Sequence, residues 1–253
     1  AKTPAKVIIF NIFDADHYRN LISWQSIHAG KSPRHISPTM PSIRANPSTG
    51  EYIERPNPCP TRDSVYRLCD PDWVDETFRD ELMLKLVLAG NNIRTGTPEK
   101  SYDPIAELAS EHGLDVTLDT PERLQDSIDE IMNHAGMFDS MKIIEKVEAF
   151  AAAHDRRALY VLSYGHQRIE RKMHEGMRID QEFVDFLDRE GLPYIDTMAA
   201  HIADYENFNT STAEYFKRYY VWHYKPAGNF FQAFAIKDRL VDMLDPKPIP
   251  YSD

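Results

Sequence analysis

Two short apolar runs, far apart in the chain, constrain the fold more than any other feature of this sequence. AKVIIFNIF (residues 5–13) and RRALYVLSYG (156–165) are rich in apolar residues and lack a regular alternation with polar ones. Runs of this kind are typical of strands that are covered on both faces of a parallel sheet. Segments with helical periodicity lie between and after these runs, so we expect an α/β fold.

The other predicted elements alternate with these strands. A third strand, LPYIDT (192–197), follows a helix over 180–191, and the final helix starts near Ala227 and runs to about Leu244. Near its start this final helix is apolar almost all round, which indicates a central, covered position. Further helices are predicted over 17–30, 70–90, 120–134 and 138–155, and a hairpin around 47–53.

The long middle of the chain lacks strand patterns. Many of the prolines lie in 31–71, and the stretch from about 72 to 154 has helical patterns only. We interpret 31–154 as an irregular and helical insertion in one α/β domain that spans 1–253. The core of this domain is predicted to have three layers, with a parallel sheet flanked by helices.

Charge and composition exclude several classes of partner. A net charge of −11 repels polyphosphate, so no nucleic-acid partner is expected. No run approaches the roughly 18 apolar residues of a membrane span, and the N-terminus lacks a signal-peptide layout. We therefore expect a soluble protein, with the cytoplasm as the favoured compartment. For Cys59 and Cys69 we favour two reduced thiols over a disulfide across the loop.

Titratable side chains follow each predicted strand, at the edge where parallel sheets bind ligands. Each has a structural alternative as well: carboxylates after a strand commonly cap the next helix, Ser163 fits a strand-end hydrogen bond, and His201 fits a helix surface. These strand-end residues are Asp14, Asp16, His17 and Arg19 after the first strand, Ser163 and His166 after the second, and Asp196, His201 and Asp204 after the third.

A further histidine, His223, stands in the loop WHYKPAGN, just before a Pro-Ala-Gly turn that opens the final helix. A loop histidine at a helix start can act as a general base, and it can equally be a capping or core residue. The choice depends on which side chains the fold brings beside it.

The layout from LYVLSYG to the end of the chain resembles the C-terminal part of SGNH (GDSL-like) hydrolases. EGLPYIDTM resembles the late strand of that family, and WHYKPAGNFFQAFAIKDRL resembles its loop histidine, turn and closing helix. VIIFNIFDADHYRN resembles the block in which an apolar strand ends in an Asn-Asp pair. The likeness covers the first twenty residues and roughly 155–245, and it implies an SGNH or flavodoxin-like three-layer fold.

The resemblance also implies a reaction and a set of residues. His223 would take the proton of a serine hydroxyl and return it to the leaving group of an ester or acylated small molecule. No metal and no cofactor are implied. The residues that would bind substrate are Asn11, Asp16, His17 and Arg19 from the first strand end, and Tyr164 and His166 from the second.

The sequence departs from the family pattern in three places. No Gly-Asp-Ser block occurs, so the family's serine has no counterpart in these residues. Tyr220 stands three residues before His223, where the family has its acid, and a tyrosine cannot act as the carboxylate orienter. Ala15 precedes Asp16 where the family has Asn-Asp, which removes a side-chain oxyanion donor; Asn11 would be directed to the site only if the strand ends early.

Two other functions and one assembly state follow from these departures. The chain could be a non-catalytic protein that keeps the hydrolase scaffold. Alternatively, IIFNIFDADH resembles the first motif of haloacid-dehalogenase-type phosphatases, with Asp14 as nucleophile, Asp16 as acid and Mg²⁺ between them and phosphate. Because three strands leave edges and an apolar face uncovered, we expect a homo-oligomer or association with a missing N-terminal segment.

Overall fold

The computed structural model describes residues 5–23, 39–79, 81, 85–86, 103–116, 121–221 and 223–246. The chain divides into two compact units. We call residues 1–14 with 143–253 the sheet unit, and residues 15–142 the hairpin unit. Among the described residues, no helix combines the length and the apolar content needed to cross a membrane.

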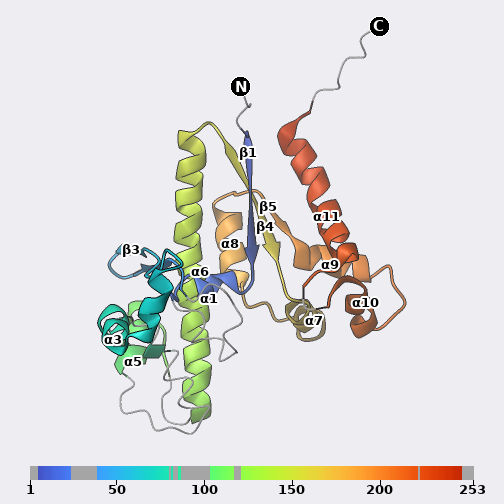
Figure 1. Ribbon diagram of the computed structural model, residues 1–253. Helices are drawn as coiled ribbons and strands as arrows, with labels where there is room; N and C mark the ends of the chain where they lie inside the picture. The colour runs from blue at the N-terminus through green and yellow to red at the C-terminus, as the bar shows by residue number, and fades with distance from the viewer. Residues whose placement is uncertain are drawn as a thin grey trace. The chain divides into compact units, whose positions relative to one another are not determined.

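The sheet unit contains a three-stranded parallel sheet in the order β1-β4-β5 (Figure 1). Its strands are β1 (Val7–Phe13), β4 (Arg157–Ser163) and β5 (Tyr194–Asp196). β1 and β4 pair along their full lengths, from Val7 opposite Arg157 to Phe13 opposite Ser163. The prediction of a mixed α/β fold with a parallel sheet is therefore confirmed, with β4 as the central strand.

Helices flank this sheet on both sides. Tyr160 of β4 donates a hydrogen bond to Glu148 of α6 (Pro121–Ala153), and its register partner Phe10 lies on the same face. The next residue of β1, Asn11, points to the opposite face and accepts a hydrogen bond from Gln232 of α11 (Pro226–Leu244). Every residue of β4 after Arg157 is buried, as its continuous apolar run predicts.

Strand β1 is less covered than its apolar sequence predicts. Ile9 is 47% exposed and Asn11 is exposed, so the expectation that both faces are buried is wrong. The reason is that β1 is an edge strand: among the described residues it pairs with β4 alone. β1 is therefore an apolar strand that the described residues cover only in part.

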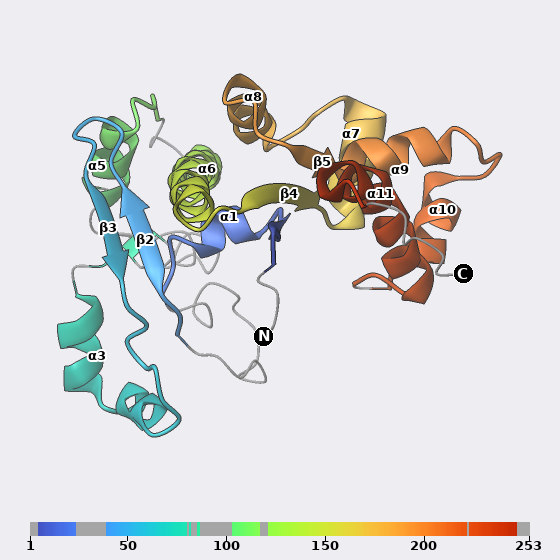
Figure 2. The same cartoon turned by 90° about the horizontal axis from the view of Figure 1, so that it is seen from above.

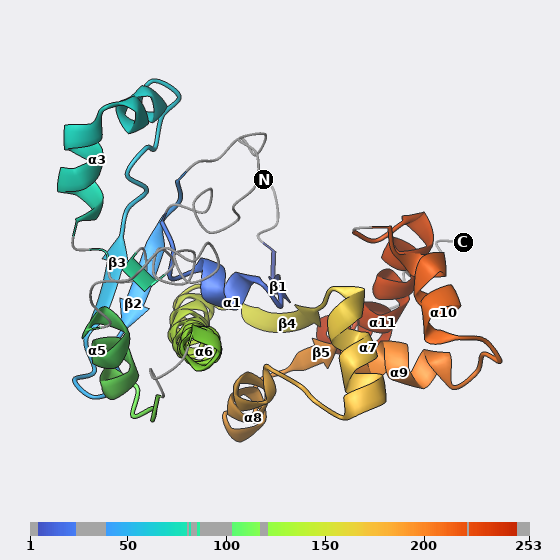
Figure 3. The ribbon, with the colours of Figure 1, turned by 90° about the horizontal axis from the view of Figure 1, so that it is seen from below.

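Helices account for most of the rest of the sheet unit. The segment after β4, to which the sequence assigns no element, is helical, and Ile169 is the one residue of this helix that is buried. α10 packs against α11, and α11 also contacts α9 (Figure 3). These helices are α7 (His166–Glu175), α8 (Gln181–Arg189), α9 (Thr197–Tyr205) and α10 (Thr212–Tyr219).

Helix α11 has the predicted bounds and opens with Pro226 at its first position. The prediction that it is covered nearly all round is wrong. One face carries Phe230 at 66% and Phe234 at 56% exposed, and further along it Val241 and Leu244 are each 48% exposed. Only the opposite face, with Gly228 and Met243 buried, packs onto the unit.

The hairpin unit combines a two-stranded hairpin with helices (Figure 2). β2 and β3 flank the predicted turn, where Gly50 has the positive φ of 72° that favours glycine. Thr120, Gly90 and residues 24–30, which end or begin predicted helices, lie outside the described residues. The elements are α1 (Asp16–Arg19), β2 (Ser42–Ala45), β3 (Tyr52–Arg55), the 3₁₀ helix η1 (Ser64–Cys69), α3 (Pro71–Phe78), α5 (Asp103–Glu111) and the first part of α6.

Helix α6 is one continuous helix of 33 residues, whereas the sequence predicts two helices with a break near Gly136. Gly136 is present for packing and does not end the helix. A Cβ at this position would lie 2.6 Å from the carbonyl oxygen of His17 and 2.9 Å from the Cα of Tyr18. Glycine thus allows the backbone of α1 to approach the helix closely.

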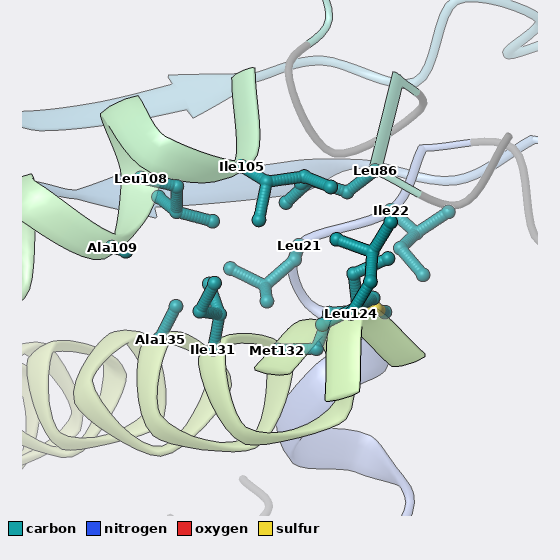
Figure 4. Packing of buried hydrophobic residues seen from close by; sticks show 11 residues of the cluster. Leu21, Ile22, Leu86, Ile105, Leu108, Ala109, Leu124, Ile131, Met132 and Ala135 are labelled. Atoms are coloured by element: carbon teal, nitrogen blue, oxygen red, sulfur yellow. The ribbon is translucent and has the colours of Figure 1, made fainter. Parts of the chain in front are cut away.

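The core of the hairpin unit lies between α5, α6 and the segment after α1 (Figure 4). Aliphatic side chains fill it, which agrees with the helical periodicity of this part of the sequence. Its buried members are Leu21, Ile22, Leu86, Ile105, Leu108, Ala109, Leu124, Ile128, Ile131, Met132 and Ala135. In the same unit Cys59 is buried and Cys69 exposed, and both are free thiols, as predicted.

Asp139 of α6 makes the stability of this unit depend on pH. The side chain is 1% exposed and accepts a hydrogen bond from the Ala45 amide at 2.7 Å. Burial raises its pKa from 3.8 to about 8, although the Ala45 amide and Arg44 act in the opposite direction. The folded state therefore binds a proton that the unfolded state releases, and its stability falls as pH rises from about 4 through 8.

Asp139→Asn should remove this dependence, because the amide still accepts from Ala45 but does not titrate. We expect the free energy of unfolding at pH 8 to rise by roughly 2–5 kcal/mol, with little change near pH 4. Urea unfolding at pH 4.5, 6 and 8 measures the effect. Asp129→Asn, at an exposed position of the same helix, is the control. Parallel pH profiles for the wild type and Asp139→Asn would contradict the expected titration.

Candidate functional site

The loop of residues 219–225 joins α10 to α11 and carries His223; we call it the His223 loop. Its two ends are held together, because the Lys225 amide donates to the Tyr219 carbonyl at 2.7 Å. Tyr220 and Tyr224 form an antiparallel bridge, and the Val221 amide donates to the His223 carbonyl at 3.0 Å. The backbone of this short loop is therefore fixed, with Trp222 outside the described residues.

His223 lies at the exposed tip of this loop. Within the described part of the chain its imidazole makes no hydrogen bond to another side chain. Tyr220 instead is buried and donates to the carbonyl of Tyr164 at 3.2 Å, which places the loop beside the carboxyl end of β4. The imidazole is thus presented to solvent from a loop that is anchored at the edge of the sheet where a site is expected.

His201 of α9 occupies the centre of the layer beneath this loop. It is 0% exposed, so the prediction of a surface helix residue is wrong. Its Nδ1 lies 3.0 Å from the Tyr215 hydroxyl and its Nε2 lies 3.1 Å from that of Tyr224. Phe231 stacks on the ring with centroids 4.0 Å apart. Burial lowers the pKa of His201 to about 4 despite the nearby Asp204, so the imidazole is neutral at pH 7.

Asp204 accepts hydrogen bonds from the hydroxyls of two tyrosines of α10. Tyr215 donates to Oδ2 at 2.9 Å and Tyr219 donates to the same atom at 3.0 Å. Burial, followed by the hydrogen bond to Asp204, raises the pKa of both tyrosines, so both remain protonated donors. The sequence singles out Asp204 and His201 as candidates, but it does not predict that tyrosines satisfy both.

A second polar cluster surrounds Arg178 in the segment between α7 and α8. Its Nε donates to Asp180 at 2.9 Å, another nitrogen contacts Asp196, and Nη2 donates to the Tyr164 hydroxyl at 2.5 Å. Asp196 also caps α9 by accepting from the Met198 amide at 2.9 Å. The structural alternative for Asp196, a helix cap, is therefore confirmed.

The end of β1 holds hydrogen bonds that link it to β4 and α7. Asn11 donates to the hydroxyl of Ser163 at 3.1 Å, and Ser163 donates to the carbonyl of Ile12 at 3.2 Å. Asp14 forms an ion pair with Arg168 at 3.2 Å. Ser163 is 5% exposed, so it is a strand-end hydrogen-bonding residue, as the sequence also suggests.

Three of the predicted substrate-binding residues belong to the hairpin unit. Asp16 and Arg19 form an ion pair within α1 at 3.1 Å and are partly exposed. His17 is 5% exposed, and its Nδ1 lies 2.9 Å from the hydroxyl of Ser140 on α6. His17 thus occupies a packing position between α1 and α6. Asn11, Tyr164, His166 and His223 belong to the sheet unit, and the substrate-binding roles of all these residues stay predictions.

A groove of about 430 Å³ lies beside the His223 loop. His166, the first residue of α7, forms part of its wall and contacts the ring of Tyr220 with centroids 5.6 Å apart. Its walls combine apolar residues with charged ones, as small-molecule sites often do. The lining residues are His166, Glu170, Ala213, Phe216, Lys217, Tyr220, Val221 and Lys225.

No family model, no curated protein and no solved structure matches this chain. The assignment of a function therefore rests on the geometry of the sheet unit and on the sequence resemblance.

Proposed function

We propose that this chain is an SGNH-hydrolase-like protein that acts on an ester or acyl group, with His223 as the general base. The observation that supports this most directly is the position of His223. Its imidazole is exposed on a loop fixed by backbone hydrogen bonds, and Tyr220 anchors that loop at the carboxyl end of β4. The groove lined by His166 and Val221 lies next to it and offers room for the acyl or alcohol part of a small substrate.

In the proposed reaction, the imidazole of His223 takes the proton of a hydroxyl as that hydroxyl attacks the carbonyl carbon. The imidazolium then gives the proton to the leaving alkoxide, and water repeats the cycle on the acyl intermediate. Ser163 does not fit the role of nucleophile, because its buried hydroxyl already donates to Ile12. Tyr220 stands where the family has its carboxylate, so the backbone hydrogen bonds of the loop fix the main chain at His223, while no described side chain orients the imidazole.

The protein as the cell makes it provides the test. We expect p-nitrophenyl acetate hydrolysis and labelling of a serine by a fluorophosphonate, both falling at least about 100-fold in His223→Ala. His174→Ala, which removes another exposed histidine of the sheet unit, should leave both unchanged. The present chain alone, with Ser163 buried, should hydrolyse the ester no faster than its own His223→Ala variant.

Three outcomes would contradict the proposal. The first is ester hydrolysis that survives in His223→Ala. The second is the absence of both turnover and serine labelling in the protein as the cell makes it. The third is hydrolysis that is lost in EDTA, restored by Mg²⁺ and absent in Asp14→Asn. The third would favour the phosphatase alternative, because that reaction requires both the metal and the aspartate nucleophile. The second would favour the non-catalytic scaffold.

We further propose that the sheet unit associates with another polypeptide segment, either a second copy of the chain or an N-terminal segment. Two features support this. Strand β1 has Ile9 47% exposed at the edge of the sheet, and α11 exposes Phe230 and Phe234 along an open groove of about 490 Å³. Exposed apolar surface of this kind usually marks an interface.

A further inference from the structure

The groups that surround His201 beneath the His223 loop indicate where its ring proton lies. Two groups that can only accept, the Asp204 carboxylate at 2.9 Å and the His201 carbonyl at 3.1 Å, lie within reach of the Tyr215 hydroxyl, so one of them takes its single proton. The same hydroxyl oxygen lies 3.0 Å from Nδ1 of His201. It has no proton left for that nitrogen, so Nδ1 must carry the hydrogen and donate it to Tyr215.

The other ring nitrogen must then be an acceptor, because burial keeps the imidazole neutral. Two hydroxyls reach Nε2, that of Tyr224 at 3.1 Å and that of Tyr220 at 3.3 Å. The Tyr220 hydroxyl also lies 3.2 Å from the carbonyl oxygen of Tyr164, which can only accept. We therefore assign the Tyr220 proton to the Tyr164 carbonyl and take Tyr224, the nearer hydroxyl, as the donor to Nε2 of His201; the hydroxyls of Tyr220 and Thr197 also adjoin that of Tyr224.

This arrangement joins the His223 loop to the helices beneath it. Tyr224 belongs to the loop, His201 to α9 and Tyr215 to α10, so the chain of hydrogen bonds runs from Asp204 up to the residue that follows His223. The ring of His201 cannot rotate freely, because Phe231 stacks on it at 4.0 Å with an interplanar angle of 18°.

We infer that His201, as the uncharged Nδ1–H tautomer, is the positioning residue of the His223 loop and acts on it through Tyr224. The inference rests on the proposed function only where it concerns catalysis, since the tautomer and the order of the loop are properties of the folded chain itself. His201 touches no substrate in this role. It holds the hydroxyl of Tyr224, and Tyr224 holds the loop from which His223 is presented.

A matched pair of variants tests this in the present chain. Tyr224→Phe removes the donor to Nε2, whereas Tyr205→Phe removes a hydroxyl that donates to the Thr210 carbonyl and has no link to His201. We expect the Val221 amide, which donates to the His223 carbonyl, to exchange with deuterium at least about tenfold faster in Tyr224→Phe. Tyr205→Phe should leave this rate unchanged, and urea unfolding of both variants corrects for any difference in global stability.

The tautomer is measured independently in the wild type by ¹⁵N NMR of the imidazole nitrogens. We expect a protonated resonance for Nδ1 and an unprotonated resonance for Nε2 of His201. A protonated Nε2, or a Val221 exchange rate that is the same in Tyr224→Phe and Tyr205→Phe, would overturn the inference. Because both readouts need no substrate, they can fail while His223-dependent hydrolysis is observed, or succeed while it is absent.

Discussion

Arg178→Ala should lower the free energy of unfolding by about 3–5 kcal/mol, because it leaves buried charges without their partner. The side chain of Arg178 is 9% exposed, and its two carboxylate partners, Asp180 and Asp196, have side chains that are 1% and 14% exposed. Tyr164 also loses a donor at 2.5 Å to its buried hydroxyl. Asp180 would then be a nearly inaccessible carboxylate whose only remaining contact from this cluster is the Tyr164 hydroxyl at 2.7 Å.

Urea unfolding followed by circular dichroism measures this loss. Arg171→Ala is the matched control, since Arg171 forms an exposed pair with Glu175 within α7, and such pairs contribute less than about 1 kcal/mol. Arg178→Lys should recover only part of the loss, because an ammonium group cannot reproduce the planar fork that reaches three partners. A loss for Arg178→Ala no larger than that for Arg171→Ala would show that solvent screens the cluster.

If the chain associates through α11 as proposed, the double variant Phe230→Glu with Phe234→Glu should make it a monomer. Both rings are more than half exposed on α11, at 66% and 56%. Together they offer roughly 200 Å² of apolar surface, since a phenylalanine buries 150–250 Å². At about 25 cal/mol per Å² this corresponds to about 5 kcal/mol, or at least a thousandfold in the dissociation constant. The negative charges of the introduced glutamates would also weaken the association if they face each other across the interface.

Sedimentation equilibrium at micromolar concentrations is the measurement. Tyr66→Glu is the control, because Tyr66 is a highly exposed aromatic residue at 74% but belongs to the hairpin unit. If the wild-type chain is a compact monomer near 29.3 kDa that unfolds cooperatively and binds no hydrophobic dye, the proposed association is wrong. In that case the exposed face of α11 and the edge of β1 are compatible with an isolated chain.

The elements that the sequence predicts correctly are those fixed by local patterns. The strand β4 follows from its continuous apolar run, and the start of α11 follows from Pro226. The hairpin of β2 and β3 follows from a turn that contains Gly50. In each of these cases the residues that determine the structure lie within the element itself.

The predictions that are wrong concern which face of a strand or helix is buried against its neighbours. Apolar residues on both sides of β1 and α11 predict burial, but the described residues provide neighbours on one side only, so Ile9 and Phe230 are exposed. The opposite error occurs at His201: a polar residue in a helix predicts exposure, yet hydroxyls from α10 and the His223 loop satisfy both of its nitrogens. A single sequence does not show which distant residues will supply such partners.

The same limit applies to the candidate site. The loop before α11 and its histidine can be recognised from the sequence, and His223 lies there, exposed. The arrangement that fixes the loop depends on Tyr220 reaching the end of β4 and on Tyr224 reaching α9. These contacts depend on how the helices pack, and the tyrosine-rich segment that provides them is equally consistent with an ordinary core.

Gly136 has a consequence for attempts to make this protein more robust. Glycine in the middle of a helix is a standard target for replacement by alanine, because alanine favours helix by about 1 kcal/mol. In α6 the added methyl group would collide with main-chain atoms of His17 and Tyr18, which cannot rotate away as a side chain can. A redesign guided by helix propensity alone would therefore change this position first and separate the two segments that the glycine allows to touch.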